Sequence, residues 1–289
     1  MHTVTIVGLG LIGGSAARDL RRENVATSII GVDQNPAHAG AALALGLVDE
    51  VLPLQEAVEK ADVVLLAVPV NAIGALLRPV LDLLPEHATL IDFGSTKSAL
   101  CGQVRQHPKR GQYVAAHPIA GTENSGPAAA LEHLYKGKTN IVCEREASSG
   151  EALATAMALF EALGLQTVFM DAETHDKQLA YISHLSHVSS FVLSMTVLDA
   201  EKAEKDIFAL AGSGFASTVR LAKSSPAMWA PIFEQNSAYL GQAIEEYITI
   251  LKQFQEHLQS GNTAILYQMM EQANKIRPVL EGKAKTPAL

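Results

Sequence analysis

The sequence VGLGLIGGS, residues 7–15, decides how the start of this chain folds. It follows an apolar run at 4–7 and carries Gly8, Gly10 and Gly13 at the spacing G-x-G-x-x-G. In a strand–turn–helix unit the first glycine permits a tight turn, the second lets the backbone approach a pyrophosphate, and the third lets the helix pack on the strand. The start of the helix then offers unpaired N–H groups and a partial positive charge to phosphates.

A carboxylate at the end of the next strand adds a second signal. Asp33 follows the apolar strand 28–32 and stands twenty positions after Gly13. A carboxylate there accepts hydrogen bonds from an adenosine ribose and repels a 2′-phosphate, so the sequence predicts NAD rather than NADP. A solvated Asp behind a Gly-rich turn is the alternative. The predicted cofactor-binding residues are Gly8, Gly10, Leu11, Ile12, Gly13, Asp33, Val68, Pro69 and Ser95.

Composition limits the class of protein. The 289 residues are 48% hydrophobic and 18% charged, as in ordinary globular proteins, and the net charge of −8 comes without a basic cluster for nucleic acid. Cys101 and Cys143 have neither metal nor redox spacing, and the first strand begins almost at Met1. We therefore expect reduced thiols, no bound metal, no signal peptide and a cytoplasmic location.

One stretch is long enough to suggest a membrane span. Residues 178–198 lack Asp, Glu, Lys and Arg, but they include two histidines and several Ser and Thr residues. Such polarity is costly in lipid, so we expect a buried helix of a soluble domain and no membrane contact.

Alternating strand-like and helix-like segments continue to about residue 170 and predict a doubly wound, Rossmann-like parallel sheet. The candidate strands are 3–7, 28–32, 63–68, 88–92, 112–116, 139–143 and 166–170, of which the last two extend the sheet. The candidate helices between them are 13–23, 36–46, 55–60, 71–83, 97–106 and 150–163.

After Asp171 the pattern is helical, over residues 173–200, 205–211, 216–223, 228–257 and 262–276. The sequence thus predicts two domains: an NAD-binding domain at 1–171 and an all-helical domain for substrate and dimerisation at 172–289. A frayed tail is expected from Gly282 onward.

Two polar segments follow predicted strands and so lie where open α/β sheets bind ligands. In Asp92–Lys97 (DFGSTK), the Ser95 and Thr96 hydroxyls are placed to touch the nicotinamide end of the cofactor. The alternative is that Ser95 or Thr96 caps the next helix, and both roles can hold at once. His117 opens HPIAGTENSG and is a candidate general base for an alcohol, because its unperturbed pKa lies near neutrality. A structural histidine is the alternative.

Two helical segments also carry candidate side chains. In YISHLSH, Ser183 and His187 share a helix face and are predicted to line a substrate pocket. His184 and His187 as metal ligands, or as buried structural histidines, are the alternatives. Arg220 follows the Gly-rich segment AGSGF and can bind a carboxylate, although an arginine on a helix is usually just solvated.

Together these segments resemble the prephenate dehydrogenase family of tyrosine biosynthesis. The matching pieces, in family order over residues 6–229, are GLGLIGGS, DFGSTK, HPIAGTENSG, SHLSH and AGSGF with the later Arg and SPAMW. The resemblance implies NAD-dependent oxidative decarboxylation of prephenate to 4-hydroxyphenylpyruvate by a homodimer joined through the helical domain.

The resemblance also implies roles for single residues. His117 accepts the hydrogen bond of the substrate's C4 hydroxyl, and Ser95 orients that hydroxyl. Arg220 binds a carboxylate. The residues that line or border the pocket are Ser183, His187, Thr122 and Glu123. Relatives often carry charged residues where this chain has Ala216 and Ser217, so an ionic gate with Glu123 is not expected.

Other functions fit parts of the same sequence. Arogenate dehydrogenase would use the same residues, since no acidic residue obviously awaits the amine of arogenate. A 3-hydroxyacid dehydrogenase or imine reductase would explain the glycines and helices but not HPIAGTENSG. A non-enzymatic NAD sensor would not need His117 beside the nicotinamide.

Overall fold

The computed structural model describes residues 1–204 and 206–282. Contacts divide it into two compact units, Met1–Leu240 and Gly241–Leu289. Residue 205 of the predicted helix 205–211, and all of the predicted frayed tail except Gly282, lie outside the described residues.

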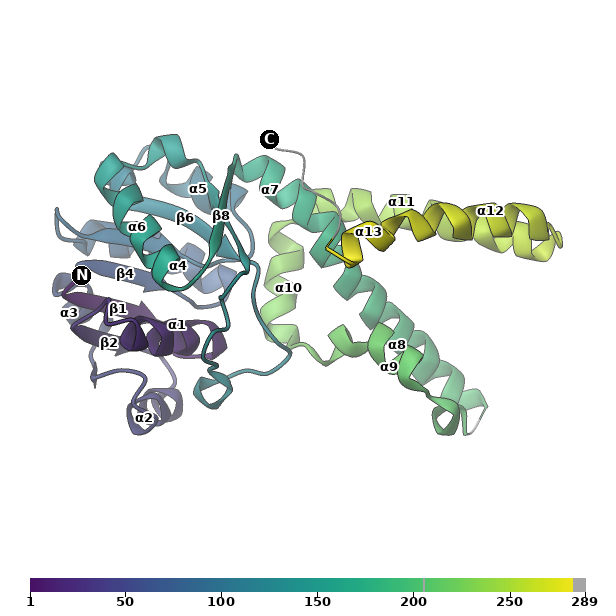
Figure 1. Ribbon diagram of the computed structural model, residues 1–289, viewed down its shortest axis with the longest axis horizontal. Coiled ribbons are helices and arrows are strands. Elements are labelled where there is room, and N and C mark those ends of the chain that lie inside the picture. Colours follow the sequence, from purple (N-terminus) through teal and green to yellow (C-terminus); the bar gives the residue numbers. More distant parts are fainter. Residues whose placement is uncertain (205, 283–289) are drawn as a thin grey trace. The chain divides into compact units, whose positions relative to one another are not determined.

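The first unit is built on a sheet with helices packed against it (Figure 1). The sheet has eight strands in the order β3-β2-β1-β4-β5-β6-β7-β8. Every predicted strand is present, with ends within two residues of those expected. The strands are β1 (Thr3–Val7), β2 (Ser28–Val32), β3 (Glu50–Val51), β4 (Val63–Leu66), β5 (Thr89–Asp92), β6 (Tyr113–Pro118), β7 (Thr139–Cys143) and β8 (Gln166–Met170).

Two features of the sheet differ from the prediction. The two-residue strand β3 was missed, because so short a segment has no periodicity to detect. The sheet is also mixed rather than wholly parallel, since β7 pairs with β6 in the antiparallel sense and β8 runs parallel to β7. The segment between β6 and β7 contains only a 3₁₀ turn, Pro127–Ala129, and a parallel pairing would need a longer crossover, usually a helix.

Helices cover both faces of the sheet. One apolar cluster packs α1 (Leu11–Arg22) and α6 (Gly150–Ala162) on one face, next to α2 (Pro36–Ala44). The other cluster packs α3 (Leu54–Glu59), α4 (Val70–Leu83), α5 (Ser98–Val104) and α7 (Ala172–Leu179) on the opposite face. The central strands are continuous buried runs, as expected for strands covered on both sides.

The helical region is more broken than predicted. The predicted helix 173–200 is α7, a π-helical turn at Ala180–His184, and α8 (Leu185–Ala203). The predicted helix 216–223 is α9 (Ser213–Thr218) and a 3₁₀ turn, and 228–257 is α10 (Pro226–Gln235) and α11 (Ser237–Gln259). The second unit continues α11 and adds α12 (Thr263–Ala273) and α13 (Arg277–Leu280).

The prediction of a buried helix at 178–198 was wrong for α8. Val192, Met195 and Leu198 are exposed, and only Ser190 of α8 is buried. Periodicity reports an apolar face but not what covers it, so the sequence could not distinguish burial within the chain from exposure. Within the described residues, no helix is long and apolar enough to cross a membrane.

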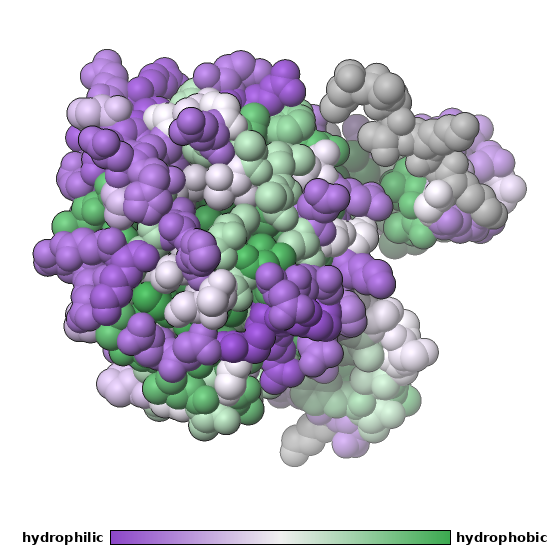
Figure 2. Space-filling view, turned by 60° about the vertical axis from the view of Figure 1, so that its left-hand side comes forward, coloured by the Kyte–Doolittle hydropathy of each residue, from purple (hydrophilic) through white to green (hydrophobic). Residues whose placement is uncertain are grey.

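Hydrophilic residues cover most of the face of the molecule seen in Figure 2, with patches of apolar residues between them. Such a mixed surface is ordinary for a folded domain.

Candidate active site

The carboxyl ends of four parallel strands bring the sequence motifs to one edge of the sheet. The register pairs Val7 with Leu66, Leu66 with Asp92, and Asp92 with Ala115. The Gly-rich turn, Val68–Pro69 and the Ser95 turn follow β1, β4 and β5, and His117 lies within β6 at its carboxyl end, just beyond the predicted strand 112–116. This edge is where open α/β sheets bind their ligands.

The Gly-rich turn has the geometry that its spacing predicts. Gly8 has a φ of +95°, and a Cβ there would lie 2.6 Å from the Ala67 carbonyl oxygen. A Cβ on Gly13 would lie 1.9 Å from the Gly8 carbonyl oxygen, so only glycine lets α1 approach β1 this closely. Gly10 is the N-cap of α1 and gives no side-chain cap, which leaves N–H groups for a phosphate. These residues fit a dinucleotide.

Asp33 is held in place next to this turn. Its Oδ2 accepts a hydrogen bond from the Leu9 N–H at 2.9 Å, and its Oδ1 accepts one from the Asn35 N–H at 2.8 Å. A carboxylate has about four acceptor sites, so capacity remains for ribose hydroxyls. His38 is a basic neighbour that the sequence reading passed over, with Nδ1 3.8 Å from Asp33 Oδ2.

A chain of three side chains ends at His117. Asp176 Oδ1 lies 2.7 Å from His175 Nδ1, and His175 Nε2 lies 2.8 Å from His117 Nδ1. If Asp176 is ionised it accepts from His175 Nδ1–H, so His175 Nε2 accepts from His117 Nδ1–H. These hydrogen bonds assign the lone pair of His117 to Nε2.

The environment keeps these histidines neutral. Burial lowers the pKa of His117 well below its usual range, and the nearby His175, Lys97 and His184 act in the same direction. Burial also lowers the pKa of His175, against the opposing effect of its hydrogen bond to Asp176. Burial of Asp176 works to raise its pKa, but hydrogen bonds, first of all from His175, keep that pKa below the usual value. A neutral imidazole at His117 is a proton acceptor.

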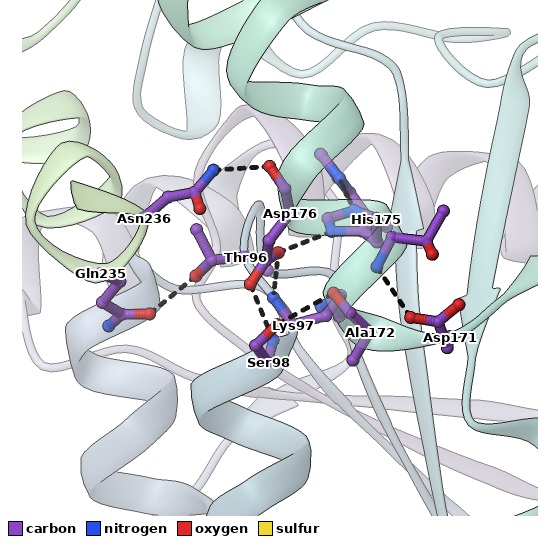
Figure 3. Close-up of polar contacts among 12 residues, drawn as sticks. Thr96, Lys97, Ser98, Asp171, Ala172, His175, Asp176, Gln235 and Asn236 are labelled. Atoms are coloured by element: carbon purple, nitrogen blue, oxygen red, sulfur yellow. Dashed lines mark hydrogen bonds and ion pairs between the residues drawn. The ribbon is translucent and has the colours of Figure 1, made fainter. Parts of the chain in front are cut away.

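The Ser95 turn is fixed from both sides. The N–H groups of Lys97 and Ser98, at the start of α5, donate to the two oxygens of Asp176 at 2.8 Å (Figure 3). The alternative that Ser95 or Thr96 caps this helix is therefore wrong, because Asp176 from α7 accepts these N–H groups. Thr96 Oγ1 donates instead to Gln235 Oε1 at 2.7 Å, and Ser95 itself is half-buried.

The helical segment places His184 and His187 in different roles. His184 is buried, and its Nδ1 accepts from Asn236 Nδ2 at 3.0 Å. His187 is half-buried, its ring stacks on Trp229 with centroids 3.4 Å apart, and its Nδ1 lies 3.0 Å from the Ser183 carbonyl oxygen. No group of three His, Cys, Asp or Glu residues in the described part of the chain is arranged for a metal ion.

Arg220 meets Glu123 across the site. Arg220 Nη1 lies 3.5 Å from Glu123 Oε2, and the Arg220 side chain is 54% exposed. Ala216 and Ser217 carry no charge for an ionic gate with Glu123, and Arg220 makes the ionic contact to Glu123 instead. Thr122, beside Glu123, accepts from the Asn124 N–H.

The segment after His117 is tied to the helix that follows the Gly-rich turn. The Leu131 N–H donates to Ser15 Oγ at 2.9 Å, and the Tyr135 hydroxyl donates to the Ile12 carbonyl at 2.6 Å. Gly126 also lies close to Gly10, since a Cβ on Gly10 would be 4.0 Å from the Gly126 nitrogen. The loop that carries Thr122 and Glu123 is thus anchored beside the proposed phosphate site.

The sequence reading missed the roles of His175 and Asp176. They follow a strand that runs to the other edge of the sheet, so the rule that ligands bind at carboxyl edges does not find them. Because β7 and β8 are reversed, β8 runs towards the opposite edge, and α7 then passes along the sheet face to reach His117. The contact between His175 and His117 can therefore be recognised only once the antiparallel pairing of β6 and β7 is known.

A Gly-rich turn that fits a dinucleotide, a carboxylate after β2 and a buried neutral histidine at one sheet edge are typical of the class of nicotinamide-dependent dehydrogenases. Comparison with protein-family models is more specific. Residues 16–169 match the nucleotide-binding domain of prephenate dehydrogenase, and residues 171–272 match its dimerization domain. The chain belongs to the prephenate dehydrogenase family.

Individual proteins similar to this chain carry names that agree with this family. The chain is 31% identical to a cyclohexadienyl dehydrogenase of Zymomonas mobilis over 96% of each chain. It is 30% identical to a prephenate dehydrogenase of Bacillus subtilis, over 98% of this chain and 77% of the relative. Among solved structures, Aquifex aeolicus prephenate dehydrogenase, in complex with hydroxyphenyl propionate and NAD+, aligns with a TM-score of 0.89 at 33% identity, over 97% of this chain and 98% of that one.

Proposed function

We propose that this chain catalyses the NAD+-dependent oxidative decarboxylation of prephenate to 4-hydroxyphenylpyruvate in tyrosine biosynthesis. The observation that carries the proposal is the Asp176–His175–His117 chain, which ends in a neutral imidazole at the cofactor edge of the sheet. Membership of the prephenate dehydrogenase family supports the substrate.

The protein's own part in the reaction is to position the substrate and move one proton. Bound NAD+ supplies the hydride acceptor. His117 Nε2 accepts the proton of the C4 hydroxyl as hydride leaves C4, and Ser95 orients that hydroxyl. Loss of CO2 then makes the ring aromatic, and the imidazolium of His117 can return the proton to the phenol oxygen. Asp176, through His175, holds the imidazole in the tautomer that this step needs.

The carboxylates of prephenate require a cation, and Arg220 supplies it. Half of its side chain is exposed, and its partner Glu123 is 3.5 Å away, so a substrate carboxylate can replace a weak contact. We place Ser183 and His187 along the pocket, and Thr122 and Glu123 at its border. The residues proposed to hold NAD+ are Gly8, Gly10, Leu11, Ile12, Gly13, Asp33, Val68, Pro69 and Ser95.

Arogenate is the second candidate substrate. Its side chain carries an ammonium next to the carboxylate, and Glu123 is an acidic group beside Arg220. A solved Synechocystis arogenate dehydrogenase also aligns with this chain, with a TM-score of 0.77 at 28% identity, over 96% of this chain and 99% of that one. NADH formation and CO2 release, followed with prephenate, with arogenate and with neither, test the proposal. Turnover of prephenate supports it, and turnover of arogenate alone assigns the other substrate.

We further propose a cytoplasmic homodimer with a helical dimerisation domain at 172–289 after a nucleotide-binding domain at 1–171. Both cysteines are free, and exposed apolar side chains are available to a second copy. On α11 and α12 they are Tyr247, Ile248, Ile250, Leu251, Leu258, Tyr267 and Met270. Light scattering of a fully active monomer at micromolar concentration would contradict the dimer.

A further inference from the structure

A buried ion pair lies behind the Ser95 turn. The side chains of Lys97 and Asp92 are both fully buried, and Lys97 Nζ lies 2.5 Å from Asp92 Oδ2. The Tyr113 hydroxyl donates to the other oxygen of Asp92 at 2.7 Å. Since the ammonium has no exposed surface, it does not touch a ligand in the site.

Lys97 connects two parts of the proposed active site. Its side chain binds Asp92 Oδ2, which also accepts the Gly94 N–H at 2.8 Å. Its backbone N–H donates to Asp176 Oδ1, the same oxygen that contacts His175 Nδ1 (Figure 3). The turn Gly94–Lys97, which includes Ser95, is therefore held to β5 at one end and to the histidine chain at the other.

We propose that Lys97 is a positioning residue: its ammonium, held by Asp92, fixes the Ser95 turn and, through Asp176 and His175, the orientation of His117. This inference rests on the proposed function, because the orientation of His117 affects turnover only if His117 accepts the substrate's proton. The contacts that carry it are independent of the substrate.

The charge of Lys97 has a second effect on the same histidines. The groups that face His117 are His175 from α7, His184 from the π-helical turn, and Lys97 from the turn before α5; Asp176 acts through His175. After burial and the other histidine, the Lys97 charge further lowers the pKa of His117. The cation thus disfavours a second positive charge at the proton acceptor.

Stability alone does not explain this pair. Taking two charges out of water costs free energy that their attraction offsets only in part, and apolar residues of similar volume often serve a fold as well. The buried pair of Lys97 and Asp92 instead holds the Ser95 turn and the histidines in a single geometry.

The test compares Lys97→Met with Tyr113→Phe. The first removes the cation from the pair, and the second removes a hydrogen bond to the same Asp92 without changing charge. If Lys97→Met does not fold because Asp92 is left unpaired, the double variant Asp92→Asn/Lys97→Met replaces it. The ¹⁵N shifts of the His117 and His175 rings, measured without substrate at pH 6 and pH 8, report tautomer and protonation. Turnover with prephenate and binding of NAD+ are measured in parallel.

We expect the wild type and Tyr113→Phe to show one neutral tautomer of His117 at both pH values. The Lys97 variant should lose the single tautomer or protonate at pH 6, and its kcat should fall about 10–10²-fold with NAD+ binding unchanged, as expected for a misplaced catalytic group. Unchanged rings and turnover would overturn the inference, as would an equal effect of Tyr113→Phe. If the wild type does not oxidise prephenate but the ring shifts respond as expected, the positioning role stands and the proposed function fails.

Discussion

Replacing His175 by leucine removes the link between Asp176 and His117 while keeping the buried volume similar. His175 is fully buried and makes contacts of 2.7 Å and 2.8 Å to its two partners. The variant leaves His117 Nδ1–H and Asp176 Oδ1 each short of one hydrogen bond. The imidazole of His117 is then free to adopt the tautomer that places its proton towards the substrate.

The expected effect follows from those lost contacts. An unsatisfied buried polar group costs about 1–3 kcal/mol. If about 1.4–3 kcal/mol of this is lost from the transition state, turnover falls about 10–10²-fold, since 1.36 kcal/mol is a factor of ten in rate. Binding of NAD+ should not change, because the Gly-rich turn and Asp33 make no hydrogen bond to His175 in the described structure.

The assay is steady-state NADH formation with prephenate, together with a thermal melt of each variant. His107→Leu is a matched control, because His107 is another buried histidine beside an aspartate, with Nε2 3.1 Å from Asp82 Oδ1. It lies in the turn after α5, before β6 begins, and so away from the carboxyl edge. A kcat for His175→Leu within twofold of wild type would refute the reasoning, as would an equal loss in His107→Leu.

Three further predictions concern other parts of the site. Arg220→Ala should raise KM for prephenate far more than it lowers kcat, because the lost charge-assisted bond contributes roughly 1.5–3 kcal/mol to the free energy of substrate binding. An unchanged KM would assign the carboxylate to another residue. Asp33→Ala should weaken NAD use and narrow the difference in kcat/KM between NAD and NADP; an unmoved ratio would leave Asp33 as a structural strand end. Stability should fall as the pH drops from ~6.5 towards 4, because burial lowers the pKa of His184 to about 4 and also lowers that of His117 and His175. In that window the unfolded chain binds more protons than the folded one, so denaturant titrations showing constant stability would contradict neutral buried histidines.

The sequence predicted the parts of this protein that depend on local geometry. The glycine spacing, the carboxylate after β2 and the buried runs of β4 and β5 each have a period or a conformational requirement that one sequence displays. His117 was expected just after the strand that is parallel to β5, and it lies within that strand, at the carboxyl end of β6.

What the sequence could not predict depends on long-range pairing. The approach of His175 to His117 requires that β7 be antiparallel to β6. The sequence of β7 does not show in which direction the strand pairs. The contact of Lys97 with Asp176 joins positions 79 residues apart. The apolar side chains of α8 likewise predict a buried helix from the sequence, and only the fold shows that they are exposed.

The central claim is that His117 accepts the substrate's hydroxyl proton, and the turnover of His117→Asn with prephenate and NAD+ tests it most directly. Asparagine keeps polarity at this position but has no basic nitrogen. We predict a fall in kcat of about 10²–10⁴-fold, typical for loss of a general base, with NAD+ binding little changed. A kcat close to that of the wild type would contradict the account.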